Sequence, residues 1–212
     1  MKYALLKFIF LSFCLAQINV ACRSKQKPAP VSPGIVVRKD TATLKKETPP
    51  ARSPIIQIVD TVLPAATVIY IKDSAASSER IVQKLAAIYG SKLNKTIKEN
   101  KLSILSPPMA WYKTNEAPFY FEAGFMVNKK PAKPGKKVWV KKVGHCKAVV
   151  AHFYGPYPST YMAYEVLSEW LKERKKQRLG NPYEIYVTDP LDKDGKQKDP
   201  YKVMTDIVFP YK

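Results

Sequence analysis

Hydrophobic and polar positions alternate most clearly in two short segments that can be laid over each other, residues 108–115 and 182–189. In the second segment Glu184 and Tyr186 share one face of an extended chain, and the residues between them face the other way. An acid within a strand rich in β-branched and aromatic residues is costly to bury unless something pairs with it. Glu184 is therefore the first candidate functional residue.

The two segments belong to an internal repeat with a period of about eighty residues. The predicted strands are residues 62–71, 108–115 and 119–127 in the first half, and 143–152, 182–189 and 201–209 in the second. A predicted helix follows the first strand of each half, with apolar residues at helical spacing: Ile81, Leu85, Ile88 and Tyr89, then Ala163, Leu167, Trp170 and Leu171. Ser78 and Ser159 are the expected N-caps of these helices.

This pattern predicts an α+β fold in which a strand-helix-strand-strand unit is used twice. The halves are expected at residues 55–130 and 136–212. Neither half can bury both faces of its strands alone, so we expect the two units to pack about a pseudo-twofold axis. A central groove on such an axis is a natural site for a ligand.

The first 21 residues have the pattern of a signal peptide. Lys2 and Lys7 form a short basic region before an apolar run of about ten to fifteen residues, which is too short for a membrane span of about twenty. Small residues then precede Cys22, which resembles the lipobox of bacterial lipoproteins, although Asn19 departs from that motif. The resemblance implies an acylated Cys22 that anchors the chain to a membrane of the cell envelope, facing the periplasm or the exterior. Cleavage by an ordinary signal peptidase is the alternative.

Residues 22–54 are rich in proline, lysine, serine and threonine and contain little apolar material. A segment of this composition cannot bury enough surface to become ordered, so we expect a disordered tether. The globular part is therefore expected at residues 55–212.

The chain is strongly basic, with a formal net charge of +19. The lysines concentrate in the tether and in residues 129–142, without a helix-turn-helix, zinc-finger or RNA-binding signature. We therefore expect no nucleic acid among the partners. For an exported chain, the expected partners of this positive charge are anionic lipid head groups and envelope polymers.

Cysteine and histidine residues do not indicate a metal site. Cys14 would leave with the signal peptide and Cys22 would carry lipid, so Cys146 has no partner for an internal disulfide. On a strand, His145 faces away from both Cys146 and His152, so three ligands do not converge. The sequence also lacks a nucleophile elbow, a phosphate-cradling glycine loop and a zinc-protease helix motif, and we expect no cofactor.

Aromatic residues gather on the segments expected to line the groove: Trp111, Tyr112, Phe119, Phe121, Tyr154, Tyr157 and Tyr186. Their rings are suited to stacking on planar ligands, and they are equally suited to filling a core. The sequence leaves both roles open for each of them.

Several of these segments resemble the GyrI-like or effector-binding domain, which occurs behind bacterial regulators of the AraC and MerR types and also stands alone. The matching stretches are 152–157, the helix over 167–171, 183–186 with Asp189 and Pro190, and 207–210. The resemblance implies that small amphipathic or aromatic molecules bind in the groove, with Glu184 at the buried acid position of the family. In multidrug-sensing members that acid faces cationic aromatic ligands.

We thus expect a lipid-anchored envelope protein that binds a small amphipathic or aromatic molecule and is not an enzyme. Two alternatives remain open. Some stand-alone members use an equivalent acid to hydrolyse strained electrophiles, a role that Glu184 could fill with Tyr186 or Tyr112. A non-catalytic scaffold could hold a partner peptide in the groove, and Glu184 could be a structural acid bonded to tyrosine hydroxyls.

Overall fold

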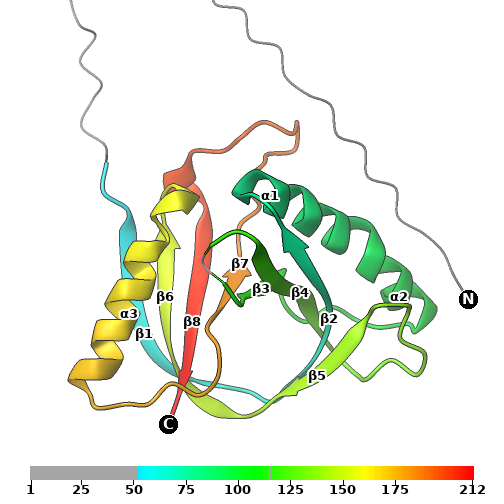
Figure 1. Cartoon of the computed structure of the whole chain (residues 1–212), viewed down its shortest axis with the longest axis horizontal. Coiled ribbons are helices and arrows are strands. Elements are labelled where there is room, and N and C mark those ends of the chain that lie inside the picture. Colours follow the sequence, from blue (N-terminus) through cyan, green and yellow to red (C-terminus); the bar gives the residue numbers. More distant parts are fainter. Residues whose placement is uncertain (1–51, 115) are drawn as a thin grey trace, which may run out of the picture. The chain divides into compact units, whose positions relative to one another are not determined.

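Alternating apolar residues build one antiparallel sheet of eight strands in the order β1-β6-β8-β7-β3-β4-β2-β5 (Figure 1). The computed structural model describes residues 52–114 and 116–212. The strands are β1 (Ile55–Leu63), β2 (Ala66–Ala75), β3 (Met109–Tyr112), β4 (Phe119–Val127), β5 (Trp139–Val143), β6 (Cys146–Tyr154), β7 (Tyr183–Tyr186) and β8 (Met204–Tyr211). The signal peptide, Cys22 and most of the expected tether lie outside the described residues.

The α-helices lie on one face of this sheet: α1 (Ser78–Ala87), α2 (Leu93–Glu99) and α3 (Tyr161–Glu173). The π-helical turn η1 (Ile88–Lys92) joins α1 to α2, and the 3-10 turns η2 (Tyr157–Ser159) and η3 (Pro200–Lys202) precede α3 and β8. The N-cap positions are Ser77 for α1 and Thr160 for α3, each one residue from the expected Ser78 and Ser159. Ser159 instead belongs to the turn η2, which precedes α3. None of the helices in the described ranges has the length and apolar character of a membrane span.

The predicted duplication is confirmed. One half contributes β2, α1, β3 and β4, and the other contributes β6, α3, β7 and β8. The halves join through the central pair β3 and β7, where Ala110 lies opposite Glu184. Because these two residues are also equivalent when residues 108–115 are laid over 182–189, the pseudo-twofold axis passes through this pair.

Two strands correct the predicted strand pattern. The predicted strand over residues 62–71 is two strands, β1 and β2, separated at Pro64 and Ala65. Strand β5 lies largely within the lysine-rich residues 129–142, where no strand was predicted. Each of these strands pairs with the first strand of the opposite repeat, β1 with β6 and β5 with β2.

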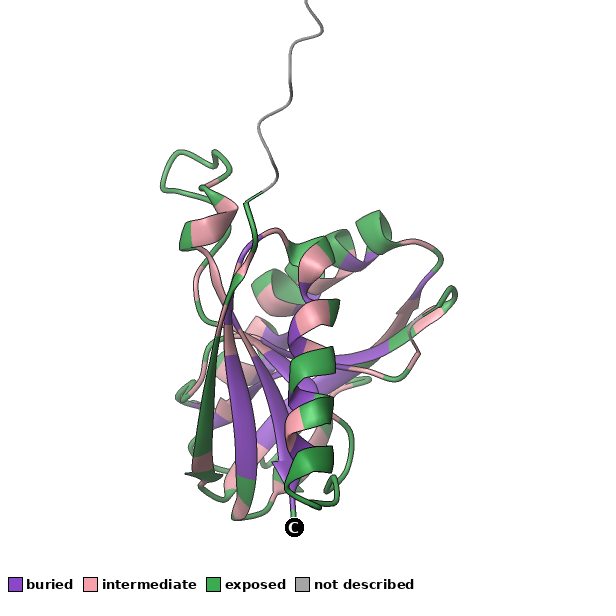
Figure 2. Ribbon diagram, turned by 90° about the vertical axis from the view of Figure 1, so that its left-hand side faces the viewer, coloured by how far each residue is buried: buried purple, intermediate pink, exposed green. Residues whose placement is uncertain are grey.

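The helix-covered face holds two core clusters, one for each half. Helix α3 packs against β6 and β8, and α1 with α2 packs against β2, which leaves β7 and β3 between the helices (Figure 1). Buried aromatic residues such as Phe121 and Phe153 fill these clusters. Figure 2 shows the interior strands as buried, with β1 and the outward side of α3 exposed.

The other face, which we call the open face, holds a third cluster. Alternate residues of the same strands point to it: Val68, Tyr70, Met109, Trp111, Ala148, Val150, Tyr183 and Val208. Because side chains alternate along a strand, Trp111 and Tyr183 face one way while Ala110 and Glu184 face the helices. The sheet therefore offers two chemically separate faces.

Candidate functional site

Glu184 lies at the centre of the helix-covered face and is only 2% exposed. It belongs to β7, a four-residue strand with β3 on one side and β8 on the other. This position removes the carboxylate from water, as the alternating sequence pattern predicts.

Five tyrosines, which we call the tyrosine cluster, surround this carboxylate: Tyr89, Tyr112, Tyr157, Tyr164 and Tyr186. The Tyr157 hydroxyl donates to Oε2 of Glu184 at 2.7 Å, and the Tyr164 hydroxyl donates to Oε1 at 2.9 Å. Each carboxylate oxygen thus has one phenolic donor. Two separate elements, η2 and α3, supply these donors.

The remaining tyrosines extend the hydrogen bonding away from the acid. The hydroxyls of Tyr112 and Tyr186 are 2.8 Å apart, and the hydroxyl oxygens of Tyr112 and Tyr157 are 3.2 Å apart. The Tyr89 ring lies 6.5 Å from that of Tyr186, and its hydroxyl donates to the Met109 carbonyl at 2.8 Å. Tyr112 and Tyr186 occupy equivalent positions of the two halves, so the cluster spans the pseudo-twofold axis.

The electrostatics of the site favour a neutral acid. Burial raises the pKa of Glu184, and the hydrogen bonds from Tyr157 and Tyr164 oppose that effect. Among the described residues no lysine, arginine or histidine forms an ion pair with Glu184. Burial and the nearby carboxylate raise the pKa of Tyr112 to about 12. The tyrosines therefore remain protonated hydrogen-bond donors around the buried acid.

The structure brings together four of the residues singled out from sequence: Glu184, Tyr186, Tyr112 and Tyr157. Other candidates lie elsewhere. Phe119 packs against the core of the first half, and Phe121 lies within that core, because both are on β4 beneath α1. Trp111 and Tyr154 lie on the open face.

Tyr89 and Tyr164 belong to the cluster but were not candidate site residues. The signal for Tyr164 is its helical spacing, since it stands three residues before Leu167 and seven before Leu171, which α3 buries. Tyr89 was predicted as part of an apolar helix face. The sequence did not indicate which group its hydroxyl would contact. Helical periodicity identifies the buried stripe but not the polar tip of a tyrosine within it.

Neither histidine takes part in the cluster. The Nδ1 atom of His152 lies 2.6 Å from Oδ1 of Asp206, its cross-strand neighbour on β8. Across the described ranges, no group of three or more histidine, cysteine or acidic side chains could hold a metal ion.

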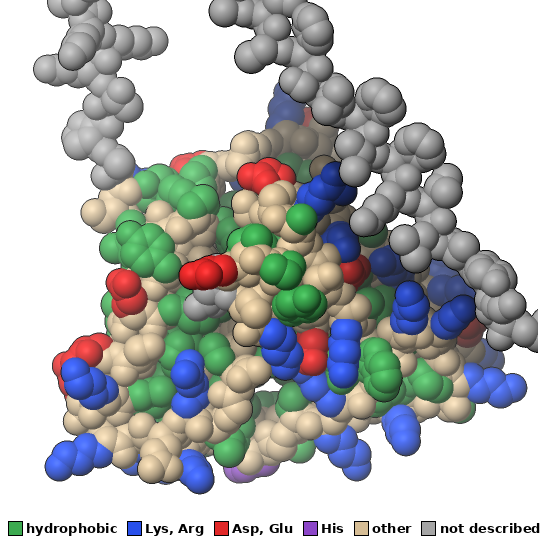
Figure 3. All heavy atoms as spheres, viewed as in Figure 1, with side chains coloured by type: hydrophobic (Ala, Val, Ile, Leu, Met, Phe, Trp, Pro, Cys, Tyr) green, Lys and Arg blue, Asp and Glu red, His purple; other side chains and the backbone are tan. Residues whose placement is uncertain are grey.

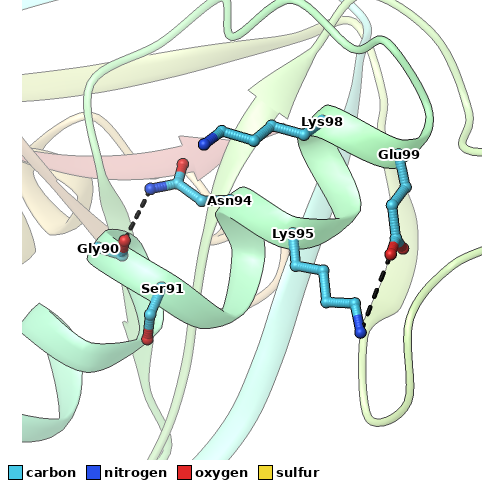
Figure 4. Close-up of a pocket in the computed structure, with 6 residues that line it drawn as sticks. All are labelled: Gly90, Ser91, Asn94, Lys95, Lys98 and Glu99. Atoms are coloured by element: carbon cyan, nitrogen blue, oxygen red, sulfur yellow. Dashed lines mark hydrogen bonds and ion pairs between the residues drawn. The ribbon is translucent and has the colours of Figure 1, made fainter.

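A surface hollow of about 510 Å³ lies along η1 and α2 and is lined by Gly90, Ser91, Asn94, Lys95, Lys98 and Glu99 (Figure 4). Its polar groups bond within their own helix: Asn94 donates to the Gly90 carbonyl at 2.8 Å, and Lys95 lies 3.9 Å from Glu99. None of the candidate residues reaches it, so we assign it no role.

Solved structures of similar fold support the architecture. The C-terminal domain of EcmrR aligns with a TM-score of 0.61 at 19% identity, covering 74% of this chain and 98% of that domain. A hydrolase from Listeria innocua aligns with a TM-score of 0.50 at 12% identity, covering 77% of this chain and 93% of the hydrolase. No curated relative matches the chain.

The expectation that nucleic acid is not among the partners is wrong. The chain also aligns with EcmrR in its complex with DNA, with a TM-score of 0.60 at 19% identity, and covers 74% of its own length and 57% of the EcmrR chain. The same fold thus occurs in a DNA complex. The absence of a nucleic-acid motif in a sequence therefore does not exclude DNA from the partners of a protein with this domain.

The family model of the GyrI-like small molecule binding domain matches residues 58–212. That range contains both repeat halves, the central pair β3 and β7, and all five tyrosines around Glu184. The chain belongs to the family of GyrI-like small molecule binding domains.

Proposed function

We propose that the domain binds a small amphipathic or aromatic cation between α1 and α3, with Glu184 as its counter-ion. The observation that carries this proposal is a carboxylate 2% exposed whose partners are tyrosines rather than a basic side chain. A buried acid without a cationic partner gains most from a ligand that supplies one. The tyrosine rings offer faces for stacking and cation–π contacts.

Tyr157 is the member of the cluster that a ligand would displace. It is 45% exposed as a residue, yet its hydroxyl reaches the buried carboxylate at 2.7 Å. It lies on η2, a three-residue turn, whereas Tyr164 is held by the thirteen-residue helix α3. A cation that replaces the Tyr157 hydroxyl would take over Oε2, while Tyr164 continues to hold Oε1.

The raised pKa of Glu184 fixes the direction of the pH dependence of binding. A cation binds the ionised carboxylate, and a raised pKa leaves the acid protonated to a higher pH than usual. Affinity for a permanent cation should therefore increase as the pH rises through the raised pKa. A neutral ligand of the same shape should lack this dependence.

Replacement of Glu184 by glutamine tests the proposal. We expect Glu184→Gln to weaken binding of rhodamine 6G to the purified full-length protein by about 1.5 to 3 kcal/mol, measured by fluorescence titration. Glu169→Gln on α3 removes the same charge from a side chain that is 59% exposed, and should bind as wild type does.

Unchanged affinity in Glu184→Gln, together with a lower melting temperature, would contradict the proposal and indicate a structural acid. Unchanged affinity with loss of turnover of a strained electrophile would indicate the hydrolytic alternative instead.

We further propose that the protein is held at a membrane of the cell envelope through an acylated Cys22. The apolar run before Cys22 and the proline-rich and lysine-rich stretch after it support this anchoring.

A further inference from the structure

The open face carries a hollow of about 430 Å³, on the side of the sheet away from Glu184. Its lining includes Trp111, Tyr183, Leu63, Met126, Lys113 and Lys141. It lies toward the connections from β1 to β2 and from β5 to β6, and Figure 3 shows the surface opened at the lower edge, where Figure 1 places those connections. A volume of this size is within the range of about 300 to 1,000 Å³ that small-molecule sites occupy.

The wall of this hollow is apolar and aromatic. Trp111 on β3 and Tyr183 on the neighbouring strand β7 lie against each other, with ring centroids 5.0 Å apart and ring planes tilted by 34°. Leu63 and Met126 are only partly buried where they pack against this pair. An apolar surface that the protein leaves partly uncovered can gain by burying the apolar body of a ligand.

One end of the hollow holds two lysines and a single acid. Nζ of Lys141 lies 2.9 Å from Oε2 of Glu122, and Nζ of Lys113 lies 3.4 Å from Oε1 of the same carboxylate. The Glu122 side chain is only 11% exposed, so its carboxylate interacts mainly with these two lysines rather than with solvent. The group therefore carries one unbalanced positive charge.

Lys141 is held in place on this surface. Its Nζ atom lies 3.3 Å from the ring centroid of Trp111 and 4.7 Å from that of Tyr70. Its pKa is lowered, first by burial and further by the charge of Lys113, while Glu122 opposes both effects. A second anion at this end would favour the charged form of both lysines.

We propose that the open-face hollow is a second binding site, which takes a small amphipathic anion with its acidic group on Lys113 and Lys141 and its apolar body against Trp111 and Met126. This site is separate from the one around Glu184, since the sheet lies between them and the required ligand charge is opposite. A ligand anion would balance the positive charge that Glu122 leaves over. Lys113, with a side chain 40% exposed, is the ammonium that such a ligand meets first.

The test uses two fluorescent probes with the same ring system and opposite charges, 1-pyrenebutyrate and 1-pyrenebutyl-trimethylammonium, titrated into the full-length protein. We expect pyrenebutyrate affinity to fall about tenfold in Lys113→Met and in Lys141→Met, because each removes a charge-assisted contact. Lys172→Met removes the same charge from a side chain 78% exposed on α3, and should leave the affinity within twofold of wild type.

A substitution of opposite sign guards against misfolding as an explanation. Glu122→Gln removes the competing carboxylate, so pyrenebutyrate should bind several-fold more tightly, which a damaged fold would not produce. Glu184→Gln should leave pyrenebutyrate affinity unchanged, while it affects only the cationic probe. The measurements can therefore contradict one proposed site without contradicting the other.

Cys146, which lines the hollow, reports the position of the probe. Alkylation of Cys146, followed by peptide mass spectrometry, should slow when pyrenebutyrate is present and not when the cationic probe is. Equal losses of affinity in Lys113→Met and Lys172→Met, or unprotected Cys146 at saturating pyrenebutyrate, would overturn the second site.

Discussion

At the scale of single residues, Glu184 combines two opposing influences. Burial disfavours its charge, whereas phenolic donors on both oxygens stabilise that charge. Since burial is the larger influence and raises the pKa, the folded protein binds this proton more tightly than the unfolded chain does. The free energy of unfolding must therefore depend on pH through this one side chain.

The sign of that dependence is fixed. The contribution of Glu184 to stability is complete below its ordinary pKa of 4.5 and is lost as the pH rises through the raised folded-state pKa. Glu184→Gln cannot ionise, so its melting temperature should gain on that of the wild type as the pH rises above the ordinary pKa of 4.5 and through the raised pKa of the folded state. Thermal melts across this range, with Glu169→Gln as the control, measure the difference. Parallel curves for wild type and Glu184→Gln would refute it.

The sequence was sufficient to find the acid and the tyrosine that shares its face, because strand alternation needs only neighbouring residues. It placed Tyr157 near the site but missed Tyr164, and it did not reveal that these two tyrosines donate to the carboxylate. Tyr157 and Tyr164 are 27 and 20 residues away along the chain, on a turn and a helix. Their contact with Glu184 depends on how α3 packs on the sheet, which periodicity alone does not determine. Trp111 was grouped with the site because it is aromatic, although its alternation with Tyr112 along β3 places it on the other face of the sheet.

At the scale of elements, the strand that precedes each repeat pairs with the other repeat, an arrangement that we call the strand exchange. Strand β1 precedes the first repeat but pairs with β6 of the second, and β5 precedes the second repeat but pairs with β2 of the first. These strands were missed because β1 is largely exposed and β5 carries lysines, so neither has a clean apolar alternation. The central strands β3 and β7 were predicted at the correct place, although each has four residues rather than the eight predicted.

Neither half should fold by itself, since each would lose a sheet partner and half of the open-face cluster. A fragment of residues 55–130 should show poorly dispersed amide signals and no sharp thermal transition. The matched fragment 48–212 should unfold in one cooperative step by circular dichroism. A cooperative transition in the shorter fragment would show that the first half folds without the strands of the second half.

At the scale of the whole molecule, one sheet separates an acidic centre from a basic one. The helix-covered face holds Glu184 among tyrosines, and the open face holds Lys113 and Lys141 around Glu122. The formal net charge of +19 hides this division, because the position of a charge in the fold decides which ligand it meets.

The proposed anchoring also belongs to this scale. Cys22→Ala should move the protein from the membrane fraction to the soluble envelope fraction, because the acyl chains supply the membrane affinity. Cys146→Ala, which removes a thiol from the folded domain, should leave fractionation unchanged. Immunoblots of separated fractions measure both. Identical distribution of wild type and Cys22→Ala after signal removal would rule out lipidation at this residue.

The position of Glu184 on the pseudo-twofold axis limits how the two repeats can evolve. Its cross-strand neighbour Ala110 is also its counterpart in the other repeat, so these two positions share one space. Acids at both would place two buried carboxyl groups on directly opposed residues, about 5 Å apart at their Cβ atoms, where one of them would have to stay protonated. A duplicated domain that keeps this geometry can therefore hold an ionised acid at only one of the two positions at a time, so the symmetry favours divergence at this position.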